Sequence, residues 1–204
     1  LFNTAEFALF FALVYGLYLV LSHRGQNLLL LAASYFFYGY WDWRYLSLLL
    51  LSTLVDYSCG RLIESTSDQR RRRLYLWASI VFSIGLLGAF KYYDFFASSL
   101  QEIAATLGFQ IAPALLKVIL PVGISFYTFQ SISYVIDVYR RQLPASRSLA
   151  DYALYVAFFP HLVAGPIVRA PKLLPQLTGR RVVTFEGFSE GCQYFLWGLF
   201  LKAC

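Results

Sequence analysis

Charged residues are scarce in this sequence. Asp, Glu, Lys and Arg together make up 14% of the 204 positions, whereas hydrophobic residues make up 59% and aromatic residues 19%. So few charged side chains could not cover the surface of a water-soluble domain of this size. We therefore expect an all-α membrane protein, a polytopic bundle of apolar helices, and not a soluble globular domain.

Motifs that carry common enzyme chemistry are also missing. The three cysteines, at positions 59, 192 and 204, lack metal-ligand spacing, and two of them lie in apolar runs, so we expect inert thiols, no disulfide and no metal site. The sequence has no Gly-Lys-Ser/Thr phosphate loop, no Gly-x-Ser-x-Gly elbow and no His-Glu-x-x-His pair. ATPase, serine hydrolase and zinc protease functions therefore have no support.

Methionine is absent altogether, and the sequence stops inside an apolar run that is too short to span a bilayer. We expect residues 1–204 to form a single transmembrane domain that is the amino-terminal part of a longer protein.

The sequence does contain a series of apolar stretches close to the length of about 20 residues that a helix needs to cross a bilayer. A turn at the lipid headgroups is expected at Trp41–Arg44, because tryptophans and a charge pair suit that level of the membrane. The predicted helices are 5–21, 27–41, 45–59, 74–96 and 115–136, followed by a re-entrant or kinked segment at 152–168 and a truncated helix at 188–204.

Basic residues give the expected orientation, because Lys and Arg beside a helix resist transfer across the membrane. The segment Arg61–Arg73 has five arginines and should be cytoplasmic. Counting helices from there puts the amino terminus and the segment 97–113 outside, and puts the loop at 22–26 and the segment Arg140–Arg147 inside. Such loops beside anionic lipid headgroups account for the net charge of +6, so we expect no nucleic-acid partner.

This pattern fails at the segment 152–168. If that segment crossed the membrane, the next loop, with Arg169, Lys172, Arg180 and Arg181, would lie outside, against the charge rule. A re-entrant segment resolves the conflict, and irregular backbone at membrane depth must be surrounded by protein or line a water-filled cavity. We therefore predict that 159–166 is part of a cavity wall. The alternative is a proline-kinked spanning helix followed by an exceptional basic loop.

The predicted helix 115–136 is expected to carry a polar face that continues just beyond its end. Polar or small residues recur there at steps of four and three, which places them on one side of the helix: Gly123, Tyr127, Gln130, Tyr134 and Asp137. A polar face inside a membrane must turn inward, and hydrogen bonding between packed helices is a simpler role for it than a substrate site. For Asp137, pairing with an arginine is the simplest role.

The two histidines lie in different surroundings. His23 is in a short loop beside Arg24 and is expected to be exposed. His161 follows Pro160 in an apolar segment, where an ionisable group is costly. Because no nucleophile or second catalytic group is spaced to work with His161, a structural hydrogen bond is favoured over a catalytic role.

Several strings in the sequence resemble the membrane-bound O-acyltransferase family. Two long motifs carry the resemblance, Leu120–Arg140 with its core Leu120–Gln130, and Phe158–Arg169. Shorter patterns resemble the bacterial branch of the family, with the alginate-modifying type as the closer match: Ala33–Tyr38, Trp41–Trp43 and Phe90–Tyr93.

The resemblance implies transfer of an acyl group, most simply acetyl, to a hydroxyl of an extracytoplasmic polysaccharide such as alginate. Acetyl-CoA or another activated acyl group would serve as a substrate, with no bound cofactor. The protein would lie in the bacterial inner membrane and work with extracytoplasmic acyl-carrying or acceptor proteins. D-alanyl or other acyl transfer to a cell-envelope polymer is the nearest alternative, and a transporter or export scaffold without covalent chemistry is the alternative from another class.

The family's catalytic histidine is expected beyond Cys204 and matches no residue here, so His161 is not assigned to that role. The residues that we regard as candidates for a cavity or substrate path are Gln130, Tyr134, Asp137, His161 and Arg169.

Overall fold

The computed structural model describes residues 4–106, 121, 123–162 and 166–203. In these ranges the chain forms helices and no strands, as predicted. The helices are α1 (Ala5–Val20), α2 (His23–Ser65), α3 (Gln69–Lys91), α4 (Tyr93–Thr106), α5 (Ile124–Tyr139), α6 (Leu149–Ala157), α7 (Phe159–Leu162), α8 (Ala170–Thr178) and α9 (Phe185–Ala203).

Helices long and apolar enough to cross a membrane are present. Asp42–Ser65 and Gln69–Lys91 meet both requirements, and Ala5–Val20 is apolar but shorter. Many large apolar side chains on these helices are exposed, including Leu9, Trp77 and Val81. Such surfaces suit contact with lipid tails or with other apolar helices. The fold class is therefore that of an all-α membrane protein.

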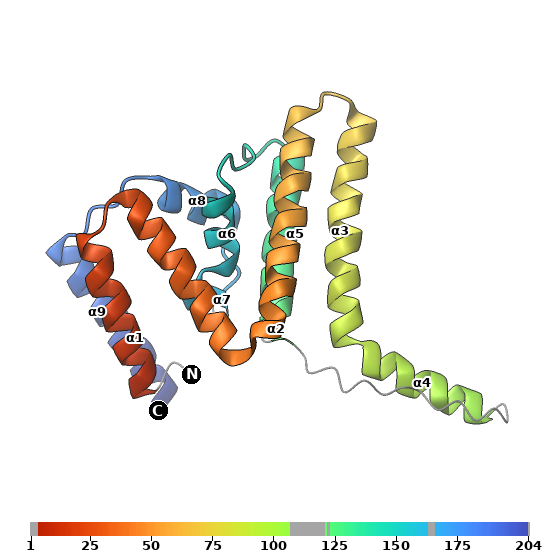
Figure 1. Cartoon of the computed structure of the whole chain (residues 1–204), viewed down its shortest axis with the longest axis horizontal. Coiled ribbons are helices and arrows are strands. Elements are labelled where there is room, and N and C mark those ends of the chain that lie inside the picture. The colour runs from red at the N-terminus through yellow and green to blue at the C-terminus, as the bar shows by residue number, and fades with distance from the viewer. Residues whose placement is uncertain (1–3, 107–120, 122, 163–165, 204) are drawn as a thin grey trace.

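Helix α2 bends at the predicted headgroup turn. Asp42 has extended backbone angles, φ −161° and ψ 111°, and its side chain accepts a hydrogen bond from the Arg44 backbone N–H at 2.9 Å. The predicted helices 27–41 and 45–59 are thus two arms of one longer helix, joined without a loop. Figure 1 shows the arms as a V, with α6, α7 and α8 between them.

The predicted helix 74–96 differs from the structure at both ends. Helix α3 already begins at Gln69, because the Asp68 side chain caps it by accepting from the Arg70 backbone N–H at 2.9 Å. The run of arginines therefore lies inside the helix, which a search for uncharged residues could not show. α3 ends at Lys91, and α4 leaves it at a steep angle (Figure 1), so part of the predicted outer segment 97–113 is helical.

Helix α5 corresponds to the later part of the predicted helix 115–136, of which residues 115–120 and 122 lie outside the described residues. It begins at Ile124, after Gly123 with φ +80°. This left-handed conformation favours glycine. A Cβ atom at Gly123 would also collide with the Leu162 carbonyl oxygen, so the absence of a side chain lets α7 pack against the start of α5.

The predicted segment 152–168 is divided between short elements. Helix α6 begins at Leu149, capped by the Ser148 hydroxyl, and ends at Ala157; α7 follows, and the chain is not helical at 166–169. Residues 163–165, part of the predicted cavity wall, lie outside the described residues. The predicted helix 188–204 is observed as α9, which lies beside α1 (Figure 1), with the Tyr15 and Phe188 rings stacked at 5.8 Å.

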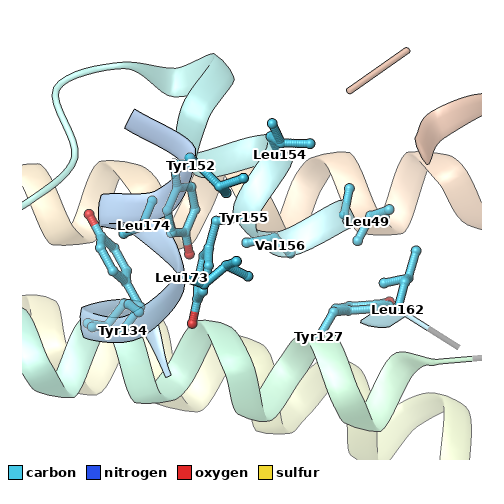
Figure 2. Close-up of a cluster of buried hydrophobic side chains, with 14 of the residues drawn as sticks. Leu49, Tyr127, Tyr134, Tyr152, Leu154, Tyr155, Val156, Leu162, Leu173 and Leu174 are labelled. Atoms are coloured by element: carbon cyan, nitrogen blue, oxygen red, sulfur yellow. The ribbon is translucent and has the colours of Figure 1, made fainter. Parts of the chain in front are cut away.

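The core lies where α2, α5 and α6 meet. Four tyrosines with almost no exposed surface form its centre, together with aliphatic residues of α2, α6, α7 and α8 (Figure 2). The tyrosines are Tyr127, Tyr134, Tyr152 and Tyr155. The hydroxyls of Tyr134 and Tyr155 form hydrogen bonds to the backbone, so these two residues fix their helices more specifically than aliphatic side chains would.

Candidate functional site

The segment 149–178 leaves one region of the protein and returns to it. Near the start of α2, the Asn27 side-chain N–H₂ donates to the Asp151 carboxylate at 2.8 Å and to the Leu177 carbonyl at 2.9 Å. One residue thus holds both the beginning of α6 and the end of α8. We call 149–178 the hairpin, because its two ends are fixed at the same place.

Arg181 strengthens this connection. Its guanidinium donates to the Asn27 side-chain oxygen and lies over the Tyr18 ring, with 5.5 Å between the carbon at its centre and the ring centroid. Asn27 therefore uses both ends of its amide group to join α2 with three other parts of the chain. The basic segment after α8 is consequently fixed next to the turn between α1 and α2.

The middle of the hairpin is attached to α5. The Gln130 side-chain N–H₂ donates to the Tyr155 carbonyl at 2.7 Å, and the Tyr155 hydroxyl lies 3.3 Å from the Gln130 carbonyl and 3.3 Å from the Val168 carbonyl. Val168 belongs to the returning part of the hairpin and Tyr155 to the outgoing part. Side chains thus satisfy the backbone carbonyls of Tyr155, near the end of α6, and of Val168, which lies outside a helix.

Asp137, at the end of α5, forms an ion pair with Arg169. The Asp137 side chain is 1% exposed and the Arg169 side chain 57% exposed. The second carboxylate oxygen of Asp137 is buried without a hydrogen-bond partner among the described residues. The expected arginine partner is therefore present, but it comes from the end of the second long motif and not from the neighbouring Arg140 or Arg141.

Tyr134 holds the connection between α5 and α6. Its hydroxyl accepts a hydrogen bond from the Ser146 backbone N–H at 2.9 Å, and its ring lies 4.5 Å from the Tyr152 ring, centroid to centroid. Tyr134 also faces Gly60 of α2, where an added Cβ would lie 2.9 Å from the tyrosine ring. These contacts are those of a packing residue.

His161 lies in α7, away from any group of possible metal ligands in the described part of the chain. Its ring packs edge-on against Phe158 with 5.2 Å between centroids, and its Nδ1 atom is buried without a hydrogen-bond partner there. Nδ1 therefore does not supply the structural hydrogen bond expected of His161 among the described residues, and the structural role of His161 stays a prediction.

A pocket of about 310 Å³ lies beside α7, between α1 and the first arm of α2. It is lined by Thr4, Glu6, Phe7, Phe10, Phe36, Phe37 and Tyr40. The Phe159 ring contacts the rings of Phe7, Phe10 and Phe37, at 5.6 to 6.4 Å between centroids. The tip of the hairpin thus packs against the aromatic side chains that line this pocket.

Asp56 is a buried ionisable residue that the sequence patterns did not single out. It is fully buried in the second arm of α2, and its carboxylate accepts hydrogen bonds from Ser79 at 2.5 Å and from Ser83 at 3.3 Å. A signal was present, since Ser52 and Asp56 are four residues apart, as are Ser79 and Ser83, and each pair shares a helix face.

Comparison with known proteins shows similarity to bacterial O-acetyltransferases. No family model and no solved structure matches the chain. The probable alginate O-acetylase AlgI of Pseudomonas aeruginosa is 43% identical over 95% of the chain, and that of Pseudomonas putida is 42% identical over 95%. The peptidoglycan O-acetyltransferase of Helicobacter pylori is 33% identical over 99% of the chain.

The chain spans 37%, 40% and 44% of the length of these three relatives. The similarity therefore covers nearly all of this chain and less than half of each relative. Within that span the chain is homologous to bacterial O-acetyltransferases, and its resemblance to the alginate-modifying branch of the membrane-bound O-acyltransferase family is confirmed.

Proposed function

We propose that this chain is part of a bacterial membrane-bound O-acyltransferase that transfers acetyl groups toward hydroxyls of an extracytoplasmic polysaccharide such as alginate. The supporting observation is 43% identity to a probable alginate O-acetylase over 95% of the chain. Acetyl-CoA or another activated acyl group would be the donor substrate. Extracytoplasmic acyl-carrying or acceptor proteins would be its partners.

In this proposal the protein crosses the inner membrane several times, with the arginine-rich segments on the cytoplasmic side. Contacts between those segments support one common face: Arg72 donates to the Tyr139 carbonyl at 2.8 Å, and Gln69 donates to the Tyr139 hydroxyl at 2.8 Å. These bonds bring the turn between α2 and α3 next to the end of α5. The hydrogen bond from Arg181 to Asn27 likewise brings the basic segment after α8 next to the turn between α1 and α2.

The hairpin would be a re-entrant segment that forms a rigid wall of the acyl-transfer cavity. Its support comes from Asn27, Gln130 and Tyr155, which tie both parts of the hairpin to α2 and α5. Backbone that is held in this way keeps its shape when a substrate binds, and preorganised dipoles are most effective where water is excluded. Gln130 and Tyr134 would act as positioning residues of this wall.

Arg169 would be the residue of the hairpin closest to the path by which the acyl donor reaches the cavity. Its side chain is more than half exposed, although one N–H group is committed to Asp137. A guanidinium has five N–H donors, so Arg169 keeps donors for an anionic group on an arriving acyl donor. We assign no catalytic base within this chain, and His161 would shape the tip of the hairpin.

Transfer of labelled acetyl groups to extracytoplasmic polysaccharide tests this proposal in membranes that contain the intact protein. The expected result is covalently bound label that depends on the protein and falls with Arg169→Gln. Covalent label that appears only with a D-alanyl donor would support D-alanyl transfer in place of acetyl transfer. Movement of polysaccharide without covalent label, from protein that is present and folded, would contradict the enzyme and support an export scaffold.

A further inference from the structure

The second arm of α2 meets α3, α5 and α6 around a fully buried polar cluster. Its centre is the Asp56 carboxyl group, and five hydroxyl groups surround it, those of Ser52, Ser79, Ser83, Ser131 and Tyr152. Each of these six side chains is at most 1% exposed. Four of its six residues lie in Asp42–Ser65 or Gln69–Lys91, which among the described residues are the helices able to cross the membrane: Ser52, Asp56, Ser79 and Ser83.

Nothing in the described part of the chain balances the charge of Asp56. It forms no ion pair there, and the partners of its carboxylate are the uncharged hydroxyls of Ser79 and Ser83. The titratable groups near it are Cys59 of α2 and Tyr152 of α6, and neither supplies a positive charge. A carboxylate at membrane depth without a counter-charge is costly, so its charge is balanced either by a proton on the carboxyl group or by one bound cation.

The hydroxyl groups around Asp56 also have unused bonding capacity. Ser52 and Ser131 face the Asp56 carboxyl, and Tyr152 interacts with both Asp56 and Ser131. These contacts lack the geometry of ordinary hydrogen bonds, so the three buried hydroxyl oxygens have no close hydrogen-bond partner among the described residues. Buried polar atoms without close partners are rare in folded proteins, and the lone pairs of these three oxygens can accept a water molecule or coordinate a cation.

We propose that Asp56, Ser52, Ser79, Ser83, Ser131 and Tyr152 form a binding site for one sodium ion inside the helix bundle. A carboxylate and hydroxyl oxygens are the ligands that hard cations prefer. One carboxylate balances one positive charge. No group of three or more His, Cys, Asp or Glu side chains occurs in the described part of the chain, which disfavours a di- or trivalent ion at this position.

The sodium ion would fasten together helices that carry the rest of the fold. Ser52 and Asp56 come from α2, Ser79 and Ser83 from α3, Ser131 from α5 and Tyr152 from the hairpin. A ligand that binds the folded protein and not the unfolded chain raises stability with its concentration. Because this effect concerns stability, it is independent of whether the protein transfers acetyl groups.

The test measures the Tm of the intact protein in lipid nanodiscs, in NaCl and in choline chloride at equal ionic strength. Sodium should raise the Tm of the wild type. Asp56→Asn, which keeps the shape of the side chain but removes its charge, should abolish the difference between the salts. Equal Tm values for the wild type in both salts would overturn the proposal and leave a bound proton as the balancing charge.

A second pair of variants tests the sodium site if Asp56→Asn does not fold. Ser131→Ala removes a hydroxyl that has no close hydrogen-bond partner, so this variant should fold. The sodium concentration that gives half of the stabilisation should nevertheless rise about tenfold. This shift is equivalent to a loss of about 1.4 kcal/mol of binding free energy. Ser133→Ala, on the same helix, removes a hydroxyl that bonds the Gln130 carbonyl and should leave that concentration unchanged. Equal sodium responses of the two variants would overturn the proposal.

Discussion

Gln130 and Tyr155 each reach the other's backbone carbonyl: the Gln130 amide donates to the Tyr155 carbonyl at 2.7 Å, and the Tyr155 hydroxyl lies 3.3 Å from the Gln130 carbonyl. The pair joins α5 to the outgoing part of the hairpin. Since the Tyr155 hydroxyl is also 3.3 Å from the Val168 carbonyl, the same pair reaches the returning part. The position of the hairpin relative to α5 therefore depends on two side chains.

Gln130→Ala should destabilise the protein and reduce acetyl transfer. It leaves the Tyr155 carbonyl buried without its donor, which costs roughly 1–3 kcal/mol. Thermal unfolding and transfer of labelled acetyl groups measure the two effects, with Ser133→Ala as a control on the same helix. Unchanged transfer by well-expressed Gln130→Ala protein would remove Gln130 from the proposed cavity wall.

Gly60→Ala should destabilise the fold although alanine is the better helix former. A Cβ atom at position 60 would lie 2.9 Å from the ring of Tyr134, which is fully buried in the core. Overpacking of this kind costs typically 1–3 kcal/mol. Gly85→Ala in α3 is the matched control, because nothing lies within 4 Å of its Cβ and it should be neutral or stabilising by up to about 1 kcal/mol. Equal Tm values for the two variants would show that α2 and α5 do not approach so closely.

Arg169→Gln should cost more stability than the double change Arg169→Gln with Asp137→Asn. The single change leaves a buried Asp137 carboxylate without its partner, whereas the double change removes both charges. Because Arg169 is more than half exposed, we expect a loss of about 1–3 kcal/mol for the single change, below the range for a fully buried pair. Chemical denaturation of the four members of the double-mutant cycle measures the coupling, and a coupling near zero would mean that the pair contributes nothing.

One cysteine placed before the hairpin and one placed in its returning part, in α8, should react from the same side of the membrane. In protein whose natural cysteines are replaced by serine, Arg147→Cys and Lys172→Cys should both be labelled by an impermeant thiol reagent added at the cytoplasmic face. Glu102→Cys, in α4, should be labelled from the outside and serves as the control. Labelling of positions 147 and 172 from opposite sides would contradict the re-entrant hairpin and support a helix that spans the membrane.

The sequence was sufficient to predict the elements that depend on local patterns. Apolar stretches of spanning length, the bend at Asp42 and the polar stripe of α5 each follow from residues close together in the chain, and the stripe residues Tyr127, Gln130, Tyr134 and Asp137 are all buried. A role in a cavity or substrate path stays a prediction for the five candidates Gln130, Tyr134, Asp137, His161 and Arg169.

Contacts between distant residues could not be predicted in the same way. Arg169 and Asp137 are 32 positions apart, and Asn27 and Leu177 are 150 apart, so no periodicity connects them. Asp56 is the clearest example of this limit. The spacing of Ser52 and Asp56, and that of Ser79 and Ser83, places each pair on one helix face, but no local pattern shows that folding brings the two pairs together.

The attachment of the hairpin to α2 and α5 also has a consequence for the order in which the protein inserts into its membrane. Asn27 and Gln130 are both translated before residue 149, so the side chains that receive the hairpin are already available when it leaves the ribosome. The hairpin can therefore dock against neighbours inserted earlier, without first crossing the bilayer. A change that delays α2 or α5 should leave the hairpin exposed to proteases and chaperones, even though its own sequence is intact.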